Sequence, residues 1–264
     1  MSNHTAKESF GRLIDIMDEL RVKCPWDQKQ TIESLRYLTI EETYELADAI
    51  LENNMDDIRK ELGDVLLHIV FYAKIASETG RFTLTEVIDG ICNKLVFRHP
   101  HVFGDVSVNS AEDVKTNWEN LKIKEGNKSI LAGVPKSLPA IVKANRVQDK
   151  VRAVGFDWDE REQVWDKIEE ELGELKVEIG RMDAEKMEAE FGDLLFSMVN
   201  AARLYGIDPE AALERTNKKF IKRFNYLEQH TIKAGRPLTS MTLDEMNAIW
   251  EEAKKEDHTG TVRS

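Results

Sequence analysis

The stretches EELGE at residues 170–174 and EFGD at residues 190–193 decide the fold of this chain of 264 residues. Each contains two acids three positions apart, a spacing that places both on one face of a helix. If the two predicted helices pack antiparallel, four carboxylates converge: Glu171, Glu174, Glu190 and Asp193. Like charges held this close repel strongly, so the arrangement needs a cation between them.

The same pattern occurs a second time, nearer the start of the chain. Adding 129 to positions 42, 45, 61 and 64 gives 171, 174, 190 and 193, and the acids at these earlier positions are Glu42, Glu45, Glu61 and Asp64. The apolar residues between them repeat at the same offset, with the spacing of an amphipathic helix. A repeat of this length predicts an all-α protein with two tandem homologous helical bundles. We place the domains at residues 1–125 and 126–264, because the segment 125–129 is polar and rich in turn-forming residues.

Composition restricts the classes to which the chain can belong. With 37 basic and 49 acidic residues its net charge is −12, which argues against a nucleic-acid polymer or an anionic membrane as partner. Cys24 and Cys92 have no counterparts in the other copy and form no Cys-x-x-Cys metal motif. The sequence shows no signal segment and no long apolar run. Together these features predict a reduced, cytoplasmic protein.

The acid clusters have two interpretations. Glutamate-rich helices usually present a solvated face. Here, however, Glu190 and Asp193 each directly precede an apolar core position, and the whole pattern is repeated. We therefore favour a metal site, with a second candidate site in the first copy. A di-iron bundle needs Glu-x-x-His, which neither acid motif contains, so all-oxygen ligands favour Mg²⁺, with Mn²⁺ as a substitute.

Basic and aromatic residues at helical spacing add to the pattern. Lys219 and Arg223 lie four positions apart, as do Trp250 and Lys254. Taken alone, such pairs are typical of a solvated helix face. Beside a metal site they suit a nucleoside polyphosphate, because Lys and Arg bind phosphate oxygens and Trp stacks on a base.

A Trp-Asp pair precedes each acid cluster, at residues 26–27 and 158–159. A tryptophan in a loop either covers a core or contacts a ligand, and the sequence leaves both interpretations open: a lid on the core or a wall for a nucleobase.

Common phosphate-binding and nucleophile motifs are absent from the sequence. It contains no Walker loop, no Gly-rich dinucleotide turn and no Gly-x-Ser-x-Gly elbow. We therefore expect metal-activated water to be the attacking group, with Glu170 or one of the ligand carboxylates as general base.

Taken together, the motifs resemble a known family. Glu-Glu-x-x-Glu followed by Glu-x-x-Asp occurs twice, with CPWD at 24–27 and RHPHVF at 98–103. This combination closely resembles the two-domain MazG nucleoside triphosphate pyrophosphohydrolases over nearly the whole chain.

The resemblance implies Mg²⁺-dependent hydrolysis of nucleoside triphosphates to monophosphate and pyrophosphate, with broad base specificity, by a homodimer. It assigns the activity to the second domain. For the first domain we expect a structural or regulatory role, and a second active site remains an alternative. It places the metal ligands on Glu171, Glu174, Glu190 and Asp193. It places the nucleotide contacts on Lys167, Glu170, Lys186, Lys219, Arg223, Trp250 and Lys254. Attack at the α-phosphorus follows from the resemblance alone.

Two alternatives remain at this point. The first is a narrower pyrophosphatase of the same superfamily, specific for a deoxynucleotide or a modified nucleotide. The second is a helical binding module that senses nucleotides without hydrolysing them. Turnover of a panel of triphosphates separates these possibilities.

Overall fold

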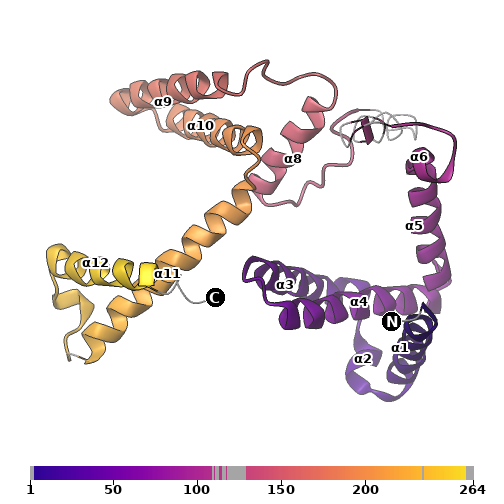
Figure 1. Ribbon diagram of the computed structural model, residues 1–264. Coiled ribbons are helices and arrows are strands. Elements are labelled where there is room, and N and C mark those ends of the chain that lie inside the picture. Colours follow the sequence, from indigo (N-terminus) through magenta and orange to yellow (C-terminus); the bar gives the residue numbers. More distant parts are fainter. Residues whose placement is uncertain are drawn as a thin grey trace. The chain divides into compact units, whose positions relative to one another are not determined.

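The computed structural model describes residues 3–108, 110, 113–114, 117, 129–233 and 235–259, and Figure 1 shows its ribbon. The chain divides into two compact units, Met1–Leu121 and Lys122–Ser264. The regular structure of the described residues is helical and includes no strand, so the predicted all-α fold is confirmed. The domain boundary expected after residue 125 lies outside the described residues.

The first unit is built around the hairpin of α3 (Ile32–Leu51) and α4 (Met55–Glu78), which pack against each other. α1 (Asn3–Lys23) packs along α4, and the short α2 (Pro25–Lys29) occupies the expected loop before the first acid cluster. α5 (Leu84–Arg98) and α6 (Pro100–Phe103) follow α4 in the chain.

The core of the first unit joins α1, α3 and α4. Its buried members are Met17, Leu35, Val70, Phe71 and Ile75, and a ring of partly buried apolar side chains surrounds them. Burial of side chains this large is the main favourable contribution to folding.

The second unit repeats the central hairpin, here formed by α9 (Gln163–Arg181) and α10 (Ala184–Leu204). α8 (Ala140–Arg152) packs against α10 and α11 (Pro209–Lys233). α11 forms a second hairpin with α12 (Leu243–Thr259), and the 3₁₀ turn η1 (Leu238–Ser240) connects them. In Figure 1, α11 diverges from the α9–α10 hairpin and carries α12 away from it.

The core of the second unit is smaller. Val164, Ile168 and Ala201 form its buried cluster, with Leu194 and Leu204 packed against it. These residues come from the mutually facing sides of α9 and α10, so they fix how the two acidic helix faces meet.

The two central hairpins turn in the same way. Asn53 and Met182, which the offset of 129 relates, both adopt a left-handed backbone, with φ of 53° and 57°. The next residue caps the second helix in each copy: Asn54 caps α4, and the Asp183 carboxylate accepts a hydrogen bond from the Lys186 N–H at 3.2 Å. A left-handed residue followed by an N-cap reverses the chain tightly, which sets the register of the acids on the paired helices.

Within the described ranges, no helix combines the length and the apolar character that crossing a lipid bilayer requires.

Candidate functional site

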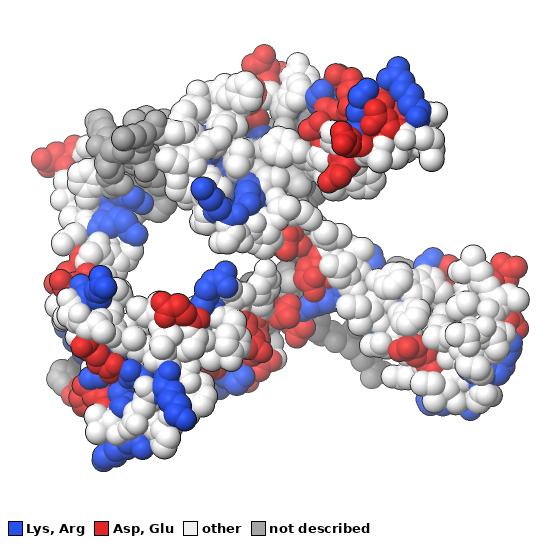
Figure 2. All heavy atoms as spheres, turned by 180° about the vertical axis from the view of Figure 1, so that it is seen from behind, with Lys and Arg blue, Asp and Glu red and all other residues white. Residues whose placement is uncertain are grey.

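The α9–α10 hairpin brings three of the four expected carboxylates together. Oxygens of Glu171 and Glu174 on α9 and of Glu190 on α10 lie within 4.8 Å of one another, and we call these residues the second-copy trio. Glu171 is only 6% exposed. Asp193 is not part of this trio, but with Glu171 it lines an adjoining hollow. Figure 2 shows acidic side chains gathered with basic ones at the far end of this hairpin.

The second-copy trio concentrates negative charge. Burial raises the pKa of Glu190, and the charges of Glu174, Glu171 and Asp193 raise it further. Burial and neighbouring negative charges both disfavour the ionised form of a carboxyl group. Several carboxylate oxygens converging on one point are the donor set that hard divalent cations prefer, so the residues present fit Mg²⁺ or Mn²⁺.

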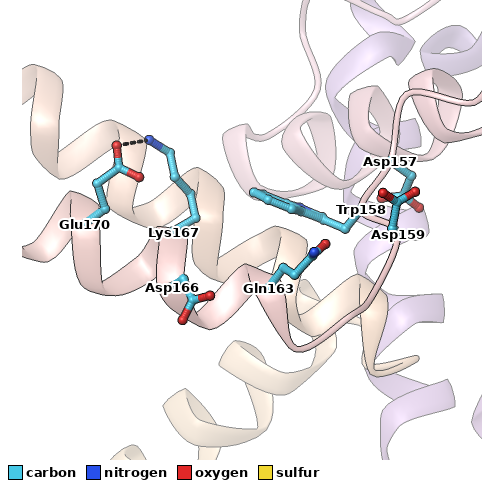
Figure 3. A pocket seen from close by; sticks show the side chains of 7 residues that line it. All are labelled: Asp157, Trp158, Asp159, Gln163, Asp166, Lys167 and Glu170. Carbon is cyan, nitrogen blue, oxygen red and sulfur yellow. Dashed lines mark ion pairs between the residues drawn. The ribbon is translucent and has the colours of Figure 1, made fainter.

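One cationic side chain adjoins the trio. The Lys167 ammonium lies 2.7 Å from Glu171 Oε1 and 3.0 Å from Glu170 Oε1. Its hydrogen bonds to Glu171 and Glu170 raise the pKa of Lys167, so the ammonium stays charged at neutral pH. Figure 3 shows the Lys167–Glu170 pair on α9, with the ring of Trp158 extending from the preceding loop toward the helix.

Two hollows adjoin this region and share Asp157, Trp158 and Lys167. The first, the acidic hollow drawn in Figure 3, has a volume of 470 Å³ and is otherwise lined by Asp159, Gln163, Asp166 and Glu170. The second, which we call the aromatic hollow, has a volume of 460 Å³. Its lining combines Phe156, Trp158 and Phe196 with Glu171 and Asp193. An apolar space therefore opens directly beside the acid site, which fits the ligand-wall interpretation of Trp158.

The loop that carries Trp158 is anchored by an ion pair. The Asp157 carboxylate accepts hydrogen bonds from both terminal nitrogens of Arg203 on α10, one of them at 3.0 Å. Burial alone would raise the pKa of Asp157, but the hydrogen bonds from Arg203 hold it below its ordinary value. Because the Arg203 side chain is almost fully buried, this pair holds the loop firmly against the hairpin.

The first copy reproduces the carboxylate geometry. Oxygens of Glu42, Glu45 and Glu61 also lie within 4.8 Å of one another, and we call these residues the first-copy trio. Burial and the charges of Asp64, Glu45 and Glu61 raise the pKa of Glu42. Glu61 is buried, and no donor among the described residues reaches its Oε2. These residues fit a divalent cation as well.

The surroundings of the first-copy trio differ. Leu38 occupies the position that matches Lys167, and it packs against the apolar core. His68 and Phe71 occupy the positions that match Ser197 and Asn200 of the aromatic hollow. Phe71 is 2% exposed and belongs to the core, and the His68 ring hydrogen-bonds with Thr39 at 2.9 Å. The first copy therefore has larger side chains than the second at both of these positions.

The other expected nucleotide contacts are distributed over the second unit. Lys186 lies 3.5 Å from Asp183 at the start of α10, one turn before Glu190. Lys219, Arg223, Trp250 and Lys254 lie on the α11–α12 hairpin, where the Arg223 guanidinium sits over the Trp250 ring at 6.0 Å. None of these four lines the acidic or the aromatic hollow. The fold thus brings Lys167 and Glu170 to the acid site, while the α11–α12 set forms a separate group.

Four residues of this region were not identified from the sequence: Gln148, Asp157, Asn200 and Arg203. The sequence did contain a signal for Asn200. The matching position of the first copy, 129 residues earlier, is the apolar Phe71, so a polar residue on the core side of α10 stands out. Gln148 belongs to α8, outside the repeated acid motifs, and no spacing rule relates it to them.

Comparison with known proteins places these features in a family. The model of the MazG nucleotide pyrophosphohydrolase domain matches residues 30–103 and 160–227, so each match includes one acid set. The nucleoside triphosphate pyrophosphohydrolase/pyrophosphatase MazG of Thermotoga maritima is 45% identical over 255 residues, covering 95% of this chain and 97% of its own length. The nucleoside triphosphate pyrophosphohydrolase of Escherichia coli K12 is 41% identical over 257 residues, covering 94% of this chain and 98% of its own length. The tandem repeat and the resemblance read from the sequence are both confirmed, and the chain belongs to the MazG nucleotide pyrophosphohydrolase family.

Proposed function

We propose that the second copy hydrolyses nucleoside triphosphates to nucleoside monophosphate and pyrophosphate, with broad base specificity and in dependence on Mg²⁺. The observation that carries this proposal is the second-copy trio, whose Glu171 pairs with the Lys167 ammonium and lines the aromatic hollow. Carboxylates, one cation and an apolar cavity are the groups that a metal-bound nucleotide needs. Relatives named as nucleoside triphosphate pyrophosphohydrolases over almost the full chain support the same reaction.

In this proposal, Glu171, Glu174, Glu190 and Asp193 hold the divalent ion, and Mn²⁺ substitutes for Mg²⁺. The bound ion supplies charge neutralisation on the phosphates and lowers the pKa of water near them. Asp193 is assigned to this set because its charge acts on Glu190 and because it adjoins Glu171 in the same hollow.

The neighbouring side chains have distinct tasks. Lys167 lines both hollows and pairs with Glu171 of the trio, so its ammonium is placed to bind phosphate oxygens beside the acid site. Glu170 pairs with Lys167 and is largely open to water, which suits a group that accepts a proton from the attacking water. The reaction breaks the bond between the α- and β-phosphates and forms a new oxygen bond at the α-phosphorus.

For the first copy, we propose a structural or regulatory role. Its trio fits a cation, but Leu38 stands in place of the proposed phosphate-binding lysine, and the core residue Phe71 stands in place of Asn200 of the aromatic hollow. A bound metal alone does not position a nucleotide there.

We further propose that the protein is a homodimer. Each copy exposes a row of apolar side chains on the helix that also carries two of its acids. The exposed residues are Leu62, Leu66 and Ile69 on α4, and at the matching positions of α10 Phe191, Leu195 and Met198. Repeated exposed stripes are typical of association surfaces. None of the basic and aromatic residues of the α11–α12 set lines a hollow of its own chain. In the proposed dimer, this set of one chain meets the acid site of the other chain. Light scattering should give twice the mass of one chain, and the mass of a single chain at micromolar concentration would contradict the dimer.

The proposed reaction is tested by chromatographic product analysis with ATP, GTP, CTP, UTP and the matching deoxynucleotides. We expect monophosphate and pyrophosphate from all of them, at rates within about tenfold of one another, since apolar pockets discriminate weakly between similar ligands. Turnover of one deoxynucleotide alone would favour the narrower enzyme. Nucleotide binding without any product would favour the binding module.

A further inference from the structure

The segment between α8 and α9 borders both hollows of the second unit, although it contributes no proposed metal ligand. Its residues Asp157 and Trp158 line the acidic and the aromatic hollow alike, as does Lys167. Trp158 is 37% exposed, so part of its ring surface is open to a ligand. Figure 3 shows this ring extending from the segment toward α9, the helix that carries Lys167. The position of the segment therefore determines part of the wall of both hollows.

The main chain supports only the beginning of this segment. The Phe156 N–H donates a hydrogen bond to the Val151 carbonyl oxygen at 3.1 Å, which closes the C-terminal end of α8. Gly155 makes this possible with a φ of 85°, a left-handed conformation that favours glycine. No hydrogen bond between main-chain groups of the described residues involves residues 157–159. These residues depend on side chains for their position.

Arg203 provides that support from α10. Its Nη1 donates a hydrogen bond to Asp157 Oδ2 at 3.0 Å, and its Nη2 donates to Asp157 Oδ1. Asn200 Oδ1 accepts hydrogen bonds from Nε at 3.1 Å and from Nη2 at 2.7 Å, which holds the guanidinium plane in place. The Arg203 side chain is 6% exposed, so water screens this pair much less than a surface ion pair.

The Asp157 carboxylate connects this support directly to Trp158. Burial alone would raise the pKa of Asp157, but hydrogen bonds from Arg203 and from the Trp158 backbone N–H hold it below its ordinary value. One carboxylate therefore joins a buried guanidinium to the residue whose ring borders the hollows. Arg152 of α8 also approaches Asp157, but at 3.5 Å and with a half-exposed side chain, so it contributes less.

The first copy lacks this connection. Lys74 occupies the position that matches Arg203, and its ammonium pairs with Asp18 of α1 at 2.6 Å. The tryptophan segment of the first copy is α2, and Arg21 of α1 supports its end by donating to the Gln30 carbonyl oxygen at 3.3 Å. Of the two copies, the one to which we assign hydrolysis is the one whose central hairpin holds the tryptophan segment through an arginine.

We propose that Arg203 is a positioning residue for nucleotide binding, which acts through Asp157 to hold Trp158 at the wall of the hollows. This inference rests on the proposed function, since it takes a nucleotide as the ligand. The segment carries neither a proposed metal ligand nor the proposed proton acceptor. Loosening it should therefore weaken the ground state and the transition state equally, which raises KM and leaves kcat nearly unchanged.

Two substitutions remove the pairing with little change in size. Arg203→Lys keeps the positive charge, but an ammonium lacks the planar fork that meets both carboxylate oxygens and Asn200 at once. Asp157→Asn places an amide donor against one guanidinium nitrogen, so one of the two hydrogen bonds is lost. Lys74→Met is the matched control, because it removes the ion pair at the corresponding position of the first copy.

Hydrogen exchange of the full-length protein tests the positioning without any substrate. We expect Arg203→Lys and Asp157→Asn to speed exchange of the amides at 155–160 by about tenfold, the effect of losing a hydrogen bond between charged groups. Exchange in α9 and α10 should change little, and Lys74→Met should leave the segment 155–160 as in wild type. Unchanged exchange at 155–160 in both variants would overturn the proposal. An equal rise throughout α9 and α10 would also overturn it, since Arg203 would then merely stabilise the hairpin.

The effect on binding is measured by a double-mutant cycle with Trp158→Ala. Arg203→Lys should raise KM for ATP by about tenfold, and it should have little further effect in the Trp158→Ala background, because no ring is left to position. Additive effects on KM, or a lower kcat at unchanged KM, would contradict an action through Trp158. If Arg203→Lys fails to fold, Asp157→Asn replaces it in the cycle.

A failure of this proposal is distinguishable from a failure of the proposed function. Absence of pyrophosphate from the wild-type protein would show that the proposed reaction is wrong. Calorimetric binding of a non-hydrolysable ATP analogue with Mg²⁺ would then replace KM in the same cycle, with the same expected factor. Equal affinity of wild type and Arg203→Lys for the analogue would overturn the role of Arg203, whether or not the wild type hydrolyses ATP.

Discussion

Glu171→Gln is expected to lower kcat for nucleoside triphosphate hydrolysis by about a thousandfold, the loss typical of removing one preorganised charged group at a reacting phosphate. Glutamine keeps the shape of the side chain, so it removes the charge with little disturbance of packing. Glu171 is the member of the second-copy trio that contacts Lys167 and also lines the aromatic hollow. Steady-state rates of pyrophosphate release measure the effect directly.

Glu42→Gln is the matched control, because the offset of 129 relates Glu42 to Glu171 and both belong to carboxylate trios. We expect this variant to retain most of the wild-type kcat, because the first copy has Leu38 in place of Lys167 and the core residue Phe71 in place of Asn200. The reverse outcome, an inactive Glu42→Gln and an active Glu171→Gln, would assign the reaction to the first copy.

Removal of divalent cations by EDTA is expected to abolish turnover, and added Mg²⁺ or Mn²⁺ should restore it. The physical reason is the mutual repulsion of the carboxylates at the second-copy trio, which together with burial raises the pKa of Glu190. Binding should also stabilise the fold: at a hundred times the dissociation constant, a cation adds about 2.7 kcal/mol per site to the free energy of unfolding. Thermal denaturation with and without Mg²⁺ measures this contribution.

The variants separate the two proposed metal sites. Glu171→Gln should lose the part of the Mg²⁺-dependent stabilisation that belongs to the second unit, and Glu42→Gln the part that belongs to the first. Undiminished hydrolysis in EDTA, after the protein has been exchanged into metal-free buffer, would show that the carboxylates do not act through a metal.

Much of the fold could be predicted from spacing. Helical periodicity and the repeated acids identified the α3–α4 and α9–α10 hairpins, since a period of 3.6 residues directly reports the buried face of a helix. The same spacing brought Glu171, Glu174 and Glu190 together, because the left-handed turn at Met182 and the cap at Asp183 fix the register. Asp193 follows Glu190 by three positions and so lies on the same face of α10, but it lines the aromatic hollow and is not part of the trio.

The remainder depends on contacts between elements distant in sequence. The aromatic hollow needs α8, the loop at 156–158 and α10 at once, and no local pattern encodes their approach. Asp157 and Arg203 are 46 positions apart, so their pairing is invisible to periodicity. The difference between the copies was accessible, however. Applying the offset of 129 to the basic residues shows Leu38 in place of Lys167 and Asp57 in place of Lys186.

The α11–α12 set shows the limit of reasoning from one chain. The spacing of Lys219 and Arg223, and of Trp250 and Lys254, correctly placed each pair on a helix. Within the second unit, these helices extend away from the α9–α10 hairpin (Figure 1). Helical spacing specifies a face of one helix, but which site that face meets depends on tertiary and quaternary packing.

The central claim, cleavage between the α- and β-phosphates with attack at the α-phosphorus, is tested most directly by hydrolysing ATP in ¹⁸O-labelled water and analysing the products by mass spectrometry. The account predicts one labelled oxygen in AMP and none in pyrophosphate, with no product from Glu171→Gln on the same time scale. Label in pyrophosphate, or ADP and phosphate as the products, would contradict it.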